Sequence, residues 1–192
     1  MTTATLPQAR GNGRLMLALV VGLLALPFAI GAGLYFGGWK PTRTIQHGQL
    51  LDPPVALPAS GLHKADGQPL PTTELQGKWL VVMQVDGPCL KECVARIDEL
   101  RRLQVSLYKE MGRLRRVVLS EQPGDTGLAI VGQQQPDLLV LGAPSGWLGS
   151  APGYRLHIVD PQGRRIMDYP AEVAAKEVRP DLERLLKFAW TG

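Results

Sequence analysis

Two cysteines, Cys89 and Cys93, are the residues of this chain whose type and spacing point most directly to chemistry. They are the only cysteines among 192 residues, and they follow the apolar run Trp79–Val85 in the segment GPCLKEC, residues 87–93. A strand that turns into a helix at a cysteine pair is a frequent site of thiol redox chemistry or soft-metal binding, because the positive end of the helix dipole favours the thiolate.

Spacing alone leaves three uses of this pair open. Positions i and i+4 share one face of a helix, so both sulfurs can reach a soft ion such as Cu(I). With Cys89 at or just before the helix start, the sulfurs can also reach bonding distance, and a redox couple would then have an exposed, low-pKa Cys89 and a resolving Cys93. The third use is a structural disulfide, although so short a loop restrains the unfolded chain little.

His157 is the candidate third ligand for copper. It lies in the expected strand 154–159, where residues 155, 157 and 159 share a face, and Arg155 on that face indicates partial solvent access. His157 is therefore either a metal ligand together with Cys89 and Cys93, or a partly exposed structural histidine.

The cysteines follow a membrane segment. Residues 15–39 contain no charged side chain and are bounded by Arg14 and Lys40. As a helix they would extend about 37 Å, enough to cross a hydrocarbon core of about 30 Å. We expect an uncleaved transmembrane helix, with a cleaved signal peptide as the alternative, although this apolar run is longer than such peptides have.

The predicted organisation is a cytoplasmic tail at 1–14, the transmembrane helix at 15–39, a proline-containing tether at 40–60 and one domain at 61–192. Basic residues flank both ends of the helix equally, so their count does not set its orientation. A short N-terminal tail stays in the cytoplasm more easily than a large domain would. We therefore expect a single-pass protein of the bacterial inner membrane whose C-terminal domain lies in the periplasm, where cysteines can be oxidised.

The domain alternates strand and helix. Strands are expected at 79–85, 116–120, 137–141, 154–159 and 164–169, and helices at 93–111, within 121–136 and at 179–190. This order predicts an α/β fold, a thioredoxin-like sandwich in which a central mixed sheet is flanked by helices. Basic residues at 96–116 are interleaved with acids, which argues against nucleic-acid binding and leaves contact with anionic lipids or an acidic partner open.

Several motifs resemble the Sco/SenC family of membrane-anchored thioredoxin-like proteins. The CxxxC spacing and the Gly77-Lys78-Trp79 lead-in, twelve residues before Cys89, are the specific ones. The segment PGDT at 123–126 resembles the family's Asp-Pro-x-x-Asp-Thr loop with one residue missing. The segment IVDPQG at 158–163 resembles its hairpin.

The resemblance implies a factor for cytochrome c oxidase assembly that binds copper, or reduces a copper site, through Cys89 and Cys93. Its partner would be a cytochrome c oxidase subunit or another periplasmic thiol or copper protein. The family's ligand histidine lies about eight residues before the hairpin aspartate, where this chain has Pro152. The alternatives are an anchored thiol-disulfide oxidoreductase, which would be an enzyme, and a redox-inactive scaffold.

Overall fold

The computed structural model describes residues 13–38 and 47–188 and divides the chain into two units, residues 1–45 and 46–192. The first unit contains the helix α1 (Gly13–Phe36), which is almost wholly apolar. At about 1.5 Å per residue, its 24 residues are long enough to cross a membrane. The predicted apolar helix is confirmed, and it begins at Gly13 rather than at residue 15. It is consistent with a single-pass anchor.

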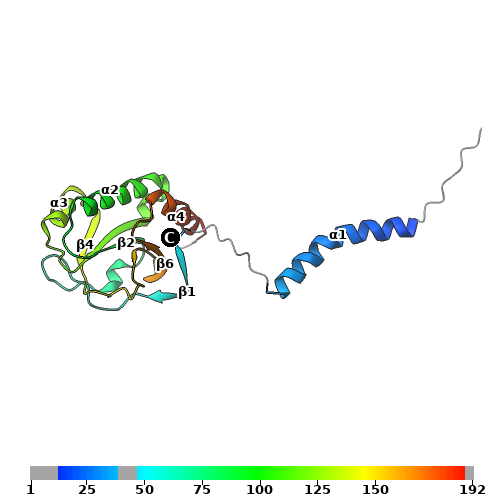
Figure 1. Ribbon diagram of the computed structural model, residues 1–192, viewed down its shortest axis with the longest axis horizontal. Coiled ribbons are helices and arrows are strands. Elements are labelled where there is room, and N and C mark those ends of the chain that lie inside the picture. The colour runs from blue at the N-terminus through cyan, green and yellow to red at the C-terminus, as the bar shows by residue number, and fades with distance from the viewer. Residues whose placement is uncertain (1–12, 39–46, 189–192) are drawn as a thin grey trace, which may run out of the picture. The chain divides into compact units, whose positions relative to one another are not determined.

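The second unit is built on a six-stranded sheet in the order β1-β6-β5-β2-β3-β4 (Figure 1). β2, β3 and β4 are parallel, whereas β5, β6 and β1 join as antiparallel neighbours, so the predicted mixed sheet is confirmed. The strands are β1 (Gln49–Ala56), β2 (Trp79–Val85), β3 (Leu114–Ser120), β4 (Leu138–Gly142), β5 (Tyr154–Val159) and β6 (Arg164–Pro170).

Helices cover one face of the sheet. The helical elements are η1 (Thr72–Leu75), α2 (Lys91–Ser106), η2 (Tyr108–Arg113), α3 (Thr126–Gln134) and α4 (Ala175–Phe188). α2, α3 and α4 pack on the same face, and the larger apolar core lies beneath them (Figure 1). A second core on the other face is closed by the segment that contains η1 and by the loop after β4.

The predicted tether at 40–60 is wrong over residues 49–56, because these residues form β1 and pair with β6. β1 is an edge strand with an irregular register between Leu50 and Val55, and such a strand tolerates Pro53 and Pro54, which have no N–H to donate. The backbone N–H groups of His47 and Gly48 donate to the Asp181 carboxylate of α4. The domain therefore begins near residue 46 rather than 61; positions 40–46 lie outside the described residues.

Two helix boundaries also differ from the prediction. The expected helix 93–111 begins at Lys91 and ends at Ser106, because Tyr108 has a left-handed backbone (φ 48°) and the chain continues as η2. The expected helix 179–190 begins four residues earlier, at Ala175, and includes Pro180. Both changes leave the order of elements as predicted.

Candidate functional site

The cysteine pair lies at the carboxyl end of β2. β2 ends at Val85, a loop follows, and α2 begins at Lys91. Cys89 belongs to the loop and Cys93 to the first turn of α2, and the two form a disulfide with 5.2 Å between their Cα atoms. The prediction that the sulfurs reach bonding distance is confirmed.

The two sulfurs differ in accessibility, and not in the way predicted. Cys89 is only 4% exposed and belongs to the helix-side core with Met83 and Leu128, whereas Cys93 is half-buried. The exposed Cys89 that a redox couple would have is not found, because the loop turns its side chain inward against α3. Cys93 is the more exposed of the two residues and so the one that another protein would reach first.

Asp125 and Gly127 of α3 hold Cys89 in place. The Asp125 carboxylate accepts hydrogen bonds from the backbone N–H of Cys89 (3.3 Å) and from that of Gly127 (3.1 Å), which caps the start of α3. A Cβ atom at position 127 would lie 2.1 Å from the Cys89 carbonyl oxygen, so only glycine allows this close approach. The sequence predicts Asp125 as part of a turn and of a family-like motif; the signal for its capping role is an aspartate directly before a helical run.

His157 lies on the other face of the sheet. It pairs in register with Val82, whose side chain lies in the second core, away from Met83 and Cys89. The side chains of directly opposite strand residues share a face, so His157 faces away from the disulfide. The structure does not bring His157 to the cysteines, and its role as a copper ligand remains a prediction that this arrangement does not support.

The environment of His157 is a buried polar cluster. The side chain is 0% exposed, so the predicted partial solvent access is wrong. Its Nδ1 lies 2.8 Å from Oδ1 of Asp168, whose Oδ2 lies 3.5 Å from Nη1 of Arg165. Arg165 donates in turn to the carbonyl oxygen of Gly149, so the cluster fastens the loop after β4 to the sheet.

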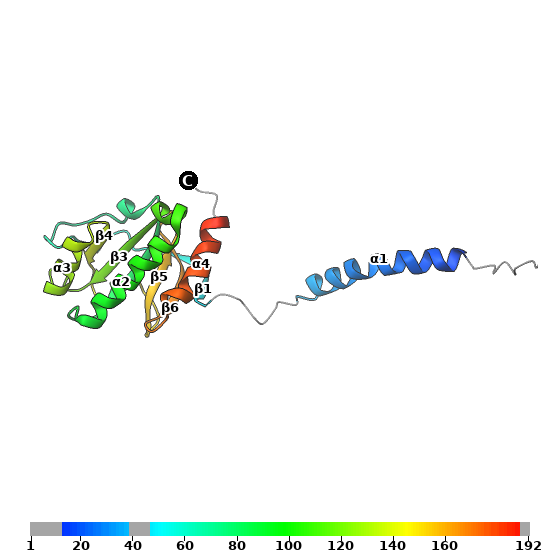
Figure 2. The same ribbon diagram turned by 90° about the horizontal axis from the view of Figure 1, so that it is seen from above.

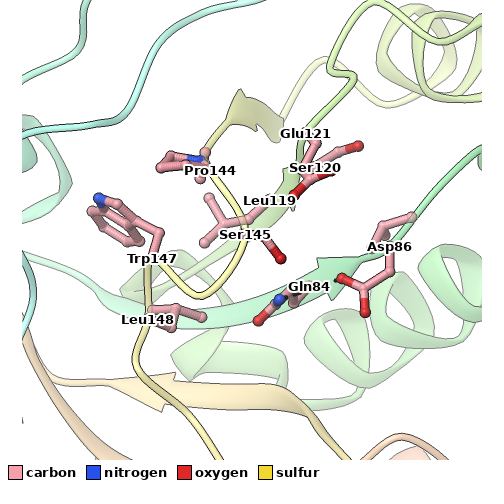
Figure 3. A pocket seen from close by; sticks show the side chains of 11 residues that line it. Gln84, Asp86, Leu119, Ser120, Glu121, Pro144, Ser145, Trp147 and Leu148 are labelled. Carbon is pink, nitrogen blue, oxygen red and sulfur yellow. Dashed lines mark hydrogen bonds between the residues drawn. The ribbon is translucent and has the colours of Figure 1, made fainter. Parts of the chain in front are cut away.

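A small pocket lies beside the cysteine loop at the carboxyl ends of β2 and β3 (Figure 3). Gln84, Ser120 and Trp147 are among the residues that line it, and the Trp147 indole N–H donates to the Ser60 carbonyl oxygen at 2.7 Å. Asp86, which opens the cysteine loop, reaches its edge and forms an ion pair with Arg155 at 2.6 Å. Asp86 is therefore held by a cation and not directed at a thiol.

The metal-binding capacity of the site depends on the cysteines. No group of three or more His, Cys, Asp or Glu side chains that could hold a metal ion occurs within residues 13–38 and 47–188. The reduced pair would offer two sulfurs, which suit a soft ion such as Cu(I). The site thus fits thiol-disulfide exchange as it stands and two-sulfur coordination once reduced.

Comparison with known proteins gives one family and a set of similar structures. The family described as transmembrane-like, thioredoxin-like, C-terminal domain matches residues 79–189. Apo Sco1 from Thermus thermophilus has a TM-score of 0.57 at 18% identity, with 76% of this chain and 99% of that chain covered. No curated protein sequence matches the chain.

Two further Sco structures are similar. Copper-bound yeast Sco1 has a TM-score of 0.52 at 16% identity, covering 69% of this chain and 94% of that chain. BsSco, a member of the Sco family of cytochrome c oxidase assembly proteins with an identified disulfide switch, has a TM-score of 0.53 at 14% identity, covering 73% and 97%. At these identities the likeness shows the fold, and it confirms the predicted thioredoxin-like sandwich.

Proposed function

The chain belongs to the family of transmembrane-like, thioredoxin-like C-terminal domains, and from this premise we propose that it is a Sco-like factor in cytochrome c oxidase biogenesis. α1 anchors it in the bacterial inner membrane, and the domain works in the periplasm. Cys89 and Cys93 either bind copper themselves or reduce the copper site of a partner. The partner is a subunit of the oxidase or another thiol or copper protein.

The observation that supports this proposal is the Cys89–Cys93 disulfide between β2 and α2, with one buried and one half-buried sulfur. The segment between the cysteines is short, and Asp125 holds the backbone of Cys89 in place. The two sulfurs therefore stay close together after the disulfide is reduced. Such a pair can alternate between a disulfide and a two-sulfur ligand without a change of fold.

The redox step balances as an exchange between two pairs of cysteines. When the chain is reduced, one of its thiolates attacks a disulfide at the partner's copper site and forms a mixed disulfide, releasing the first partner thiol. The second cysteine then attacks the mixed disulfide, releases the other partner thiol and closes the Cys89–Cys93 bond, so the partner takes up two electrons and two protons. A dithiol donor must then reduce this bond again by the same exchange in reverse. Without copper, the same step makes the chain a thiol-disulfide oxidoreductase, the second candidate function, which the accessible Cys93 favours.

An anaerobic Cu(I) titration of the reduced full chain in detergent, against a competing chelator, tests the copper proposal. We expect one equivalent of Cu(I) bound per chain, and loss of binding in Cys89→Ser and in Cys93→Ser. His157→Gln should bind as the wild type does, because His157 lies on the opposite face of the sheet.

Two results would change this assignment. Binding no stronger than that of the double cysteine variant would remove copper from the proposal and leave thiol exchange. Weakened binding in His157→Gln, with an unchanged circular dichroism spectrum, would show that a two-sulfur site is incomplete and that His157 contributes to it.

A further inference from the structure

The end of the domain opposite the cysteines carries an unusual surface. β2 runs toward the cysteine loop and α2 runs back along the sheet, so the last turn of α2 and the following η2 lie at the amino end of β2 (Figure 2). The Gln104 amide, near the end of α2, donates to the carbonyl oxygen of Leu114, which pairs with Trp79, the first residue of β2. This amino end is thus separated from the disulfide by the length of a strand.

Positive charge is concentrated there. Residues 101–116 contain six arginines and lysines and one glutamate, a net charge of +5, whereas the whole chain has +4. Only Arg116 is buried, bound to Asp137 and Gln135. The neighbouring acids are engaged: Asp98 accepts from Gln135, and Glu110 pairs with Arg113 at 2.7 Å.

Exposed apolar side chains lie among these cations. Val105, Tyr108 and Met111 are 57%, 76% and 49% exposed. Tyr108 also has φ 48°, a left-handed conformation that a bulky residue rarely adopts. The chain thus maintains an unfavourable backbone conformation that directs a large aromatic side chain into solvent, where burial does not stabilise it.

We propose that this surface, formed by Arg101, Arg102, Val105, Tyr108, Lys109 and Met111 and called the basic end below, docks on an anionic lipid membrane. Cations with an aromatic and aliphatic side chains between them are the combination that binds the interface of such a membrane, where each cation strengthens binding about fivefold. This inference rests on the membrane anchoring proposed above and not on the cysteine chemistry.

The anchor makes a lipid surface the favoured partner. Ten residues, 37–46, connect the end of α1 to the domain, and they can span at most about 35 Å. A domain held this close to a bilayer meets it at a high effective concentration, so weak docking is sufficient.

Hydrogen exchange of the full chain in lipid nanodiscs tests the docking. We expect residues 101–113 to exchange several-fold more slowly in discs of mixed phosphatidylcholine and phosphatidylglycerol than in discs of phosphatidylcholine alone, and high salt to abolish the difference. Arg101→Gln with Arg102→Gln should remove the protection. The double variant Lys64→Gln with Lys176→Gln, which loses the same charge from exposed positions elsewhere, should retain it.

Tyr108→Asn separates docking from folding. Asparagine tolerates a left-handed backbone, so this variant should unfold at the same temperature as the wild type or higher while losing lipid-dependent protection. Equal protection in neutral and anionic discs, or equal loss in both charge variants, would overturn the docking alone. Failure of the chain to enter discs would overturn the anchoring and the docking together, whereas Cu(I) binding by the detergent-solubilised chain would be unaffected by either result.

Discussion

At the scale of single residues, the cysteine site is defined by neighbours that have no redox chemistry of their own. Asp125 binds the backbone of Cys89, and Gly127 leaves the space that the Cys89 carbonyl occupies. Asp125 caps α3 and Gly127 lies in its first turn, more than thirty residues along the chain from the cysteines. The position of the disulfide therefore depends on the packing of α3 as much as on its own loop.

Gly127→Ala should destabilise the domain. The new Cβ would lie 2.1 Å from a backbone oxygen, which cannot move aside as a flexible side chain can, so we expect a loss of roughly 1–3 kcal/mol in the free energy of unfolding. The gain of up to about 1 kcal/mol from replacing a helical glycine by alanine does not offset this. Urea unfolding of the oxidised protein measures the change.

Gly124→Ala is the matched control, because no heavy atom outside its immediate chain neighbours lies within 4 Å of a Cβ at that position. It should unfold as the wild type does. A Gly127→Ala variant as stable as Gly124→Ala would contradict the close approach of α3 to Cys89.

His157 and Cys89 show which properties of the site the sequence could and could not reveal. Alternation along β5 predicted which residues share a face with His157, but not which face the cysteines occupy, since that depends on how α2 packs on the sheet. In the same way, the motif predicted the bond between the cysteines but not the burial of Cys89. Residue identity and local spacing were sufficient to predict that the two sulfurs can reach each other and insufficient to predict their accessibility.

At the scale of elements, the strand that the sequence obscured is β1. Its two adjacent prolines are typical of a linker, and only its pairing with β6, more than a hundred residues later, stabilises it as a strand. β2 has the predicted limits because it is an almost wholly apolar run that is buried in the sheet, and β5 has them because the turn residues 160–163 end it. Local patterns therefore identify central strands more easily than edge strands.

The contact between β3 and the start of β4 gives the stability of the domain a dependence on pH. Burial alone would raise the pKa of Asp137, but the hydrogen bond from Arg116 and the charge of that guanidinium lower it below the ordinary value. A carboxyl whose pKa is lower in the folded state stabilises the protein above its unfolded pKa, near 4, and this stabilisation is lost as the pH falls through the folded value.

Asp137→Asn should therefore be less stable than the wild type at pH 7, by about 0.5–1 kcal/mol because the carboxylate is more than half exposed and screened by solvent. The difference should shrink as the pH falls below about 4. Urea unfolding at a series of pH values measures it. Burial raises the pKa of Glu99, but hydrogen bonds from the Ala175 backbone and from Arg96 lower it below its ordinary value. The wild type and the variant should therefore both still lose some stability in acid, because both retain Glu99. Parallel curves for the two proteins would contradict the role of Asp137.

At the scale of the whole molecule, the two surfaces to which we assign functions lie at opposite ends of one sheet. The parallel strands and the returning α2 place the disulfide at the carboxyl end of β2 and the basic end at its amino end. The exposed side chains of the basic end belong to neither apolar core, whereas Cys89 is a buried member of the helix-side core and Cys93 packs against it. A change at the cysteines therefore affects the helix-side core but not the basic end.

Because Cys89 is one of many buried residues in that core, reduction of the disulfide should weaken the domain without unfolding it. A bond that closes a loop of five residues contributes about 2 kcal/mol by loop entropy, against a total stability of about 5–15 kcal/mol for a domain of ordinary stability. The bonds from Asp125 and the packing of α3 do not require the sulfur–sulfur bond. The reduced full chain in detergent should keep its circular dichroism spectrum and unfold at a moderately lower urea concentration, as should the Cys89→Ser/Cys93→Ser variant. If the reduced chain loses its circular dichroism spectrum and the double variant keeps it, free thiols disturb the core. If both lose it, the fold requires the disulfide, and the basis for a redox cycle is removed.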